Sequence, residues 1–456
     1  MRLNFPEKET LQNRLALFMY AFFVFALIFA TKTVYSGFHL SDDQILIGFR
    51  TQTDHRSFFS SAINAIKDDL YLRFRPLAIL YYMALAKWLY PNFFLIAATV
   101  ALQGIFACYF LYRFARLLQC AFVASFLFPL FILCGNQGVI FWRNCVNETF
   151  GMLLLSLSLF FMGKLFKAKL SYNRNLVFFS IFLLLSTLAK ESFIILVPAI
   201  IFFKIWQDFL QADTTFLRAV KANIKLVAFF AVITIAEILI IYHYKAISNH
   251  FIEYVAIDKD TFNTSNLFIS FYRLVITKGY LLIIAPALIS ILSKRQQLYT
   301  WRKDVKKFFL PLCIIFLLIT IPQVVLYAKS LIFERYLLPG TLGCAVVIIF
   351  FTKYIHQHNK QLTLLCNTFL LTCGLLLCVQ IFLMIKAAPV YAAAGFEARA
   401  VLDTIVQNTN TNDTILLVAF AEGQSDKAIS VKAYLNAPIG GNRKNIFIEP
   451  IIDSTV

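Results

Sequence analysis

The sequence predicts an all-α polytopic membrane protein with about eleven transmembrane helices. Of the 456 residues, 60% are hydrophobic and only 14% are charged, whereas soluble chains average roughly 45–50% apolar and about 25% charged residues. Apolar stretches of about 20 residues, the length that spans a bilayer, recur along the whole chain. The net charge of +18 fits an excess of Lys and Arg in cytoplasmic loops.

The first predicted span, residues 12–34, follows a charged N-terminus and has no clear small-residue cleavage site, so we expect it to stay in the protein. The later apolar stretches give ten more spans. In order they are 92–112, 117–135, 148–166, 175–189, 191–206, 226–243, 266–292, 308–327, 336–352 and 362–386. Eight of the nine Cys residues lie in apolar runs, which predicts neither a disulfide framework nor a zinc site.

Residues 76–90 are apolar but short, and Lys87 interrupts them. If they crossed the membrane, every later basic loop would face outward, against the positive-inside rule. We therefore expect residues 76–90 to lie in the membrane plane, or to form a re-entrant pair of turns, on the outer side. The N-terminus is then cytoplasmic and the C-terminus is outside.

This topology divides the chain into a transmembrane domain, residues 1–386, and a small extracytoplasmic C-terminal segment, residues 387–456. The long first outer loop is 35–91. In the C-terminal segment, 391–407 predicts a helix and 415–420 a short strand. We expect this α/β segment to pack on the outer face of the membrane domain, because it is too small to have much core of its own.

The polar residues that stand out fall mostly on the outer side. The first group is Ser41-Asp42-Asp43-Gln44. One interpretation is a capped helix start, with Ser41 as the N-cap and Gln44 at the capping-box position. The other is a functional acidic pair, in which one carboxylate serves as general base or the two bind a cation.

Four further groups share this double interpretation as interfacial anchors or as binding residues. Arginines and Lys190 could bind phosphate, or they could be membrane-surface anchors and structural ion pairs. The groups are Arg73-Phe74-Arg75-Pro76, the segment Trp142-Arg143-Asn144 with Asn147-Glu148, the pair Lys190-Glu191, and Glu334-Arg335-Tyr336 with Pro339.

Together these motifs resemble the GT-C superfamily of polytopic glycosyltransferases that use polyprenyl-phosphate sugars, which includes protein O-mannosyltransferases and bacterial aminoarabinose and glucosyl transferases. The resemblance covers the membrane domain in order. It consists of an acidic pair after the first span, Phe74-Arg75-Pro76-Leu77, a polar second outer loop, Lys190-Glu191 after a Leu-rich span, and Arg335-Tyr336-x-x-Pro339. The family pattern also has in-plane helices in the first outer loop, which the resemblance places here at 57–68 and 76–90. The second loop departs from the family pattern, because it has no Asp-x-Asp or Asp-x-Glu.

The resemblance implies inverting sugar transfer to an acceptor hydroxyl, on a glycan, lipid or protein, at the non-cytoplasmic face of a bacterial inner membrane. The implied roles fall into three sets. Asp42 and Asp43 would be catalytic, with Asp42 as the base; Arg73, Arg75, Lys190, Arg335 and Tyr336 would bind the donor phosphate; and Arg143, Glu148 and Glu191 would orient the acceptor or a divalent cation, Mg or Mn. No nucleotide and no nucleic-acid partner is expected.

Two other classes of function stay open at this point. A lipid or glycan transporter or flippase would place ionisable residues near the bilayer midplane in broken helices, often with internal repeats. An outer-face glycan ligase or polymerase would carry its key residues in a large late loop. In this chain the charges gather at one interface, no repeat is visible, and the longest loop is the first, which favours the glycosyltransferase.

Overall fold

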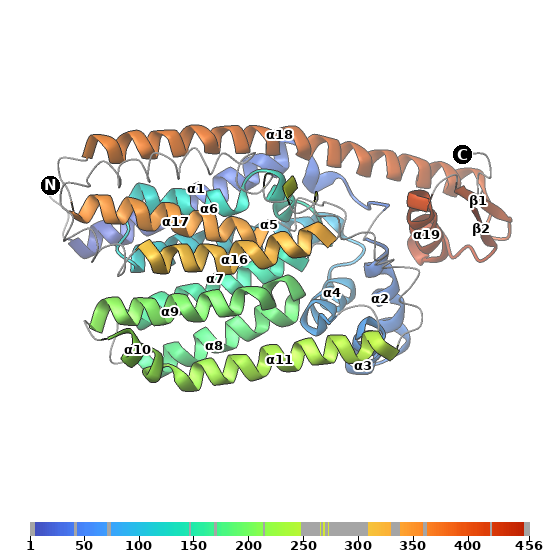
Figure 1. The fold of residues 1–456 in the computed structure, drawn as a ribbon. Coiled ribbons are helices and arrows are strands. Elements are labelled where there is room, and N and C mark those ends of the chain that lie inside the picture. The colour runs from blue at the N-terminus through green and yellow to red at the C-terminus, as the bar shows by residue number, and fades with distance from the viewer. Residues whose placement is uncertain are drawn as a thin grey trace.

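The computed structural model describes residues 5–40, 43–70, 74–145, 147–167, 171–212, 215–247, 265, 268–269, 272, 309–329, 338–358, 363–419 and 422–450. This part of the chain is mainly a bundle of long helices that run side by side (Figure 1). The bundle helices are α1 (Phe5–Ala30), α5 (Phe93–Leu117), α6 (Phe122–Leu133), α7 (Asn147–Leu165), α8 (Tyr172–Ala189), α9 (Val197–Ala212), α11 (Ile224–Ile247), α16 (Leu310–Lys329), α17 (Leu338–His358) and α18 (Thr363–Asn408), with the short α10 (Phe216–Ala222) before α11.

Seven helical segments of the described residues are long and apolar enough to cross a membrane. They are Glu9–Ala30, Phe93–Leu117, Asn147–Leu165, Tyr172–Ala189, Glu191–Gln211, Ile224–His243 and Leu370–Asn408. Three shorter apolar helices, Phe122–Leu133, Leu310–Pro322 and Gly340–Phe350, fall on further predicted spans. The predicted span 266–292 lies almost wholly outside the described residues. An all-α membrane fold is thus confirmed, while the number eleven stays a prediction.

Three short helices gather at one end of the bundle: α2 (Gln44–His55), α3 (Phe58–Leu70) and α4 (Pro76–Trp88) (Figure 1). α3 and α4 overlap the two segments expected to lie in the membrane plane. Each has 13 residues, which at about 1.5 Å per residue gives about 20 Å, less than the roughly 30 Å of a hydrocarbon core. Their length therefore supports the prediction that residues 76–90 do not span.

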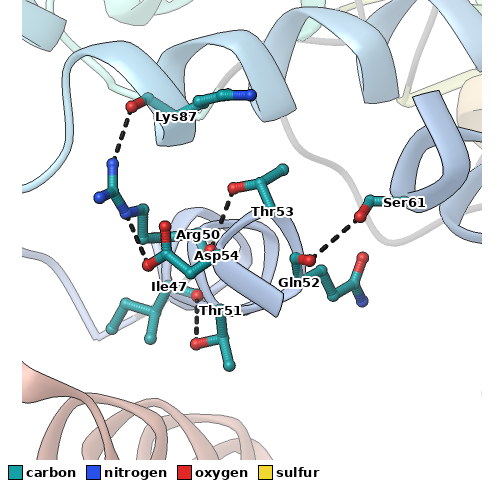
Figure 2. A network of polar contacts seen from close by, with 8 residues as sticks. All are labelled: Ile47, Arg50, Thr51, Gln52, Thr53, Asp54, Ser61 and Lys87. Carbon is teal, nitrogen blue, oxygen red and sulfur yellow. Dashed lines mark hydrogen bonds and ion pairs between the residues drawn. The ribbon is translucent and has the colours of Figure 1, made fainter. Parts of the chain in front are cut away.

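Polar contacts fasten these three helices to one another, and Figure 2 shows them. The Arg50 side chain on α2 donates from Nε to Asp54 Oδ2 (2.9 Å) and from Nη1 to the Lys87 carbonyl at the end of α4 (2.8 Å). A cation suits this position, because the last carbonyls of a helix are unpaired and carry partial negative charge. Ser61 on α3 donates to the Gln52 carbonyl near the end of α2 (3.1 Å).

The C-terminal segment is joined to the bundle by α18, which runs without a break through the predicted domain boundary at 386/387 and extends beyond the other helices (Figure 1). It leads to β1 (Ile415–Ala419), α19 (Glu422–Asn436) and β2 (Ile446–Pro450), and β1 pairs with β2 in parallel. Arg443 donates to the carbonyls of Val406 (2.8 Å) and Thr409 (2.6 Å) and so caps the end of α18.

One apolar cluster joins the C-terminal segment to the first outer loop and α2. Phe38 and Ile47, from the first loop and α2, share it with Leu402 of α18 and with Tyr434 and Leu435 of α19. The short segments η1 (Thr33–Tyr35), η2 (Asn136–Phe141), η4 (Glu191–Leu196) and η10 (Pro438–Gly440) complete the described elements used below. The C-terminal segment therefore contacts the same end of the bundle as α2.

Candidate functional site

Asp43 immediately precedes α2 and is almost fully buried, with 2% of its surface exposed. Its Oδ2 accepts a hydrogen bond from the His39 backbone N–H (3.0 Å) and another from Asn144 Nδ2 (3.2 Å). Asn144 also donates to the Gly37 carbonyl (3.4 Å). The first outer loop and the loop before α7 are thus joined through one carboxylate.

This geometry differs from a simple capped helix. The capping-box interpretation needed Gln44 three residues after a Ser41 cap, but α2 begins at Gln44 with Asp43 at the N-cap position. The Asp43 side chain makes no capping hydrogen bond to the helix. Its carboxylate instead faces Asn144, a residue about a hundred positions away, which is unusual for a residue that serves only to start a helix.

His39 is buried beside Asp43. Its ring stacks on the Tyr391 ring of α18, with centroids 3.8 Å apart, and its Nε2 lies 2.8 Å from Ser36 Oγ. Burial, reinforced by the positive charge of Arg143, lowers the pKa of His39 to about 4. His39 is therefore neutral at pH 7, and its backbone N–H holds Asp43 without adding charge to the site.

Arg75 lies at the start of α4 between two carboxylates. Its Nη2 is 2.8 Å from Asp69 Oδ1 at the end of α3, and its Nε is 3.8 Å from Glu191 Oε1. Burial acts to lower the pKa of Arg75, but Glu191 and Asp69 outweigh it and raise that pKa above its ordinary value. Arg75 is therefore a neutralised cation that ties α3 and α4 to the junction of α8 and η4.

Lys190 and Glu148 form a second, deeper ion pair, in which Nζ lies 3.3 Å from Oε1. Both side chains are buried. Close packing of α7 against η4 brings them together, because a Cβ on Gly151 would lie 2.6 Å from the Phe193 ring. Such buried pairs cost several kcal/mol to break by removing one partner.

Tyr82 of α4 links the two pairs. It is buried and interacts electrostatically with Glu148, Arg75 and Cys145. Burial raises the pKa of Tyr82 well above its ordinary value, so its hydroxyl keeps its proton and can donate a hydrogen bond. That hydroxyl has no hydrogen-bond partner in the described structure.

Other buried polar atoms of these segments also lack a hydrogen-bond partner among the described residues. They are Trp142 Nε1, Asn144 Oδ1 and Asn147 Oδ1. An unsatisfied buried polar group costs roughly 1–3 kcal/mol, so several in one region indicate a place that water or a ligand completes. Together with Asp43 and the two ion pairs they define the candidate site.

Of the ten residues predicted for the site, the structure pairs Arg75 with Glu191 and Lys190 with Glu148, and it holds Asp43 through His39 and Asn144. Asp43, Arg75, Glu148, Lys190 and Glu191 make the contacts above; Arg143 is half-buried and acts electrostatically on His39. Asp42, Arg73, Arg335 and Tyr336 lie outside the described residues. Within the described part of the chain, no three His, Cys, Asp or Glu side chains are grouped as a metal site would need, and the divalent cation stays a prediction.

Sequence reasoning missed four members of the site: His39, Asp69, Tyr82 and Tyr391. His39 and Asp69 could have been found, because each is a polar residue in the first outer loop within a few positions of a predicted site residue. Tyr391 carried no local signal, because only the packing of α18 on the first loop brings it there.

Comparison with protein-family models and with curated proteins finds no match to this chain.

Proposed function

We propose that this protein is a membrane glycosyltransferase that moves a sugar from a polyprenyl-phosphate donor to an acceptor hydroxyl at the outer face of a bacterial inner membrane. The observation that carries the proposal is the buried Asp43 carboxylate, which His39 and Asn144 hold just before α2. The buried cations Arg75 and Lys190 lie at the start of α4 and at the end of α8, and α4 contacts both α2 and α8. A donor with an apolar tail and an anionic head group would lie at this boundary between lipid and water.

In the proposed reaction Asp42 accepts the proton of the acceptor hydroxyl as general base. The acceptor oxygen attacks the anomeric carbon from the face opposite the phosphate and forms the new glycosidic bond. The bond between that carbon and the phosphate oxygen breaks, and polyprenyl phosphate leaves with the electron pair, which inverts the anomeric centre. Asp43, fixed by His39 and Asn144, positions the segment that carries Asp42.

The contacts of the cations refine the proposed phosphate site. Arg75 and Lys190 are each paired with carboxylates, so neither brings an uncompensated charge to the donor. We propose that Arg75 offers hydrogen-bond donors besides those on Asp69, and that Arg73, Arg335 and Tyr336 complete the phosphate site. Arg143, Glu148 and Glu191 then orient the acceptor, and Lys190 positions Glu148.

The direct test uses the full chain purified in lipid nanodiscs with a panel of radiolabelled polyprenyl-phosphate hexoses and a cell-envelope extract as acceptor source. We expect the wild type to release polyprenyl phosphate and label the acceptor with one donor of the panel. Asp42→Asn should lower that rate by at least about 100-fold, the usual contribution of a general base. Asp54→Asn, at an exposed carboxyl of α2, is the matched control and should keep the rate.

A further inference from the structure

A separate cavity of about 430 Å³ lies beside the candidate site. We call it the outer pocket. It is enclosed by the first outer loop (Val34–Phe38), the start of α5 (Pro91–Phe94), α18 (Arg399, Leu402, Asp403) and the C-terminal segment (Tyr434, Ile439). Its volume falls within the roughly 300–1,000 Å³ of small-molecule sites.

Aromatic rings and one charge pair shape the outer pocket. Tyr35 and Phe94 stack with centroids 5.7 Å apart, and both rings are exposed. The pocket is also lined by Arg399 and Asp403, whose Nε and Oδ2 atoms lie 3.6 Å apart. Their side chains are 67% and 50% exposed. The polar wall therefore has hydrogen-bond donors and acceptors but no net charge.

This combination suits a sugar. The C–H face of a pyranose ring packs on an aromatic ring, while its hydroxyls exchange hydrogen bonds with planar charged groups. An anionic head group would find Arg399 already neutralised by Asp403. A prenyl chain would displace water from the Arg399–Asp403 pair and offer it no hydrogen bonds in return, which is unfavourable.

The outer pocket shares a wall with the candidate site. Gly37 lines the pocket and its carbonyl accepts from Asn144, while the next residues lead through Phe38 to His39, whose N–H holds Asp43. Along α18, Arg399 lies eight residues beyond Tyr391, about 12 Å further from the bundle. That end of α18 extends toward the C-terminal segment (Figure 1). The pocket thus lies where α5 begins and where α18 continues toward the C-terminal segment.

We propose that the outer pocket binds a sugar unit of the acceptor at a distance from the reacting hydroxyl, so that the acceptor is a glycan. This inference rests on the proposed function. The lipid-linked donor then approaches from the bundle, and the acceptor approaches from the aqueous side along α18. The C-terminal segment contributes Tyr434 and Ile439 to the acceptor site.

The test has a binding arm that does not depend on turnover. Saturation-transfer NMR on the full chain in nanodiscs uses the methyl pyranosides of glucose, mannose, galactose and N-acetylglucosamine as probes. We expect at least one probe to receive saturation from the wild type, and the signal to be lost in Phe94→Ala and in Arg399→Gln. Phe382→Ala removes an exposed α18 ring that does not line the pocket and should keep the signal, as should Asp42→Asn.

The kinetic arm uses the transfer assay. Arg399→Gln should raise the KM for the acceptor glycan by about tenfold, the value of one hydrogen bond to a charged group, and leave kcat and the donor KM unchanged. If sugar transfer occurs but Arg399→Gln leaves the acceptor KM unchanged, the assignment of the outer pocket is wrong while the proposed function stands. Saturation of no probe, or a signal that Phe94→Ala and Arg399→Gln leave intact, would also overturn it. If the wild type binds a sugar probe, both variants lose that binding, and the wild type transfers sugar to no acceptor, the result would support the sugar-binding pocket and contradict the proposed function.

Discussion

At the scale of single residues, the site depends on charges that are neutralised in pairs. Arg75 faces Asp69 and Glu191, and Lys190 faces Glu148. Paired buried charges are costly to disturb and fix the geometry of the segments that carry them. The ion pairs therefore hold the starts of α4, α7 and η4 in a fixed arrangement.

The Lys190–Glu148 pair gives the first prediction. Lys190→Met leaves a buried carboxylate without its partner, so we expect a loss of about 3–5 kcal/mol of stability, seen as a lower thermal midpoint in detergent. The double variant Lys190→Met/Glu148→Gln should recover much of that midpoint but not sugar transfer. A double variant as unstable as the single one would contradict a direct pair between the two residues.

His39 gives a pH-dependent prediction. Its pKa is about 4 in the folded protein and 6.5 in the unfolded chain, so between these values the unfolded state binds more protons. Stability should therefore fall as pH is lowered from about 6.5 to about 4. In thermal melts across this window, His39→Gln should show a shallower fall. His55→Gln, at an exposed histidine of α2, should lose stability with falling pH as steeply as the wild type. If the two variants lose stability equally steeply, His39 is not the group responsible for this pH dependence.

At the scale of elements, α18 serves as a support for the site loops. Tyr391 packs on His39, and a Cβ on Gly395 would lie 2.5 Å from the Ser36 carbonyl oxygen and 2.7 Å from the His39 ring. Further along the helix toward its N-terminal end, Gly138 of η2 is in contact with Met384. The first outer loop and the loop before α7 therefore rest on one continuous helix.

Gly395→Ala tests this support. The added methyl group meets backbone, which cannot move aside as a flexible side chain can, so we expect a loss of about 1–3 kcal/mol and reduced sugar transfer. Thermal melts and the transfer assay measure the two effects. Gly374→Ala is the matched control on the same helix, because its Cβ would meet nothing within 4 Å. If both variants behave alike, the contact does not support the loop.

The elements also show what the sequence could and could not predict. Apolar length located most of the long helices that the structure describes, and Pro76 is a local signal for the start of the helix predicted at 76–90. The resemblance placed the helix at 57–68, whereas the short α10 and the polar α19 were not predicted. The continuous α18 was missed, since the change in composition near residue 387 was interpreted as a boundary. The contacts of Asp43 with Asn144 and of His39 with Tyr391 depend on tertiary packing, which no local pattern reveals.

At the scale of the whole molecule, the short helices α2, α3 and α4 and the C-terminal segment lie at one end of the bundle (Figure 1). The site residues Asp43 and Arg75 belong to the starts of α2 and α4, at this end. Many basic residues lie where the helices reach the other end, such as Arg116 at the end of α5 and Lys167 after α7. The positive-inside rule assigns that basic end to the cytoplasm. We propose that the site end faces the periplasm, as the proposed reaction requires.

Cysteine labelling tests this orientation. A membrane-impermeant maleimide should label Thr411→Cys and Asp54→Cys in intact cells, because both positions are exposed at the site end. Lys167→Cys and Lys221→Cys should react only after the cells are opened. Labelling above that of the parent chain is the readout, since the chain has Cys residues of its own. The reversed pattern would place the site in the cytoplasm.

The central claim is that the Asp42-Asp43 region is a site of sugar transfer, and mass spectrometry of cell-envelope glycans tests it most directly. Cells without the gene and cells that carry only Asp42→Asn should lack the same sugar, and the wild type and Asp54→Asn should restore it. Identical glycans with and without the gene would contradict the claim, as would full restoration by Asp42→Asn.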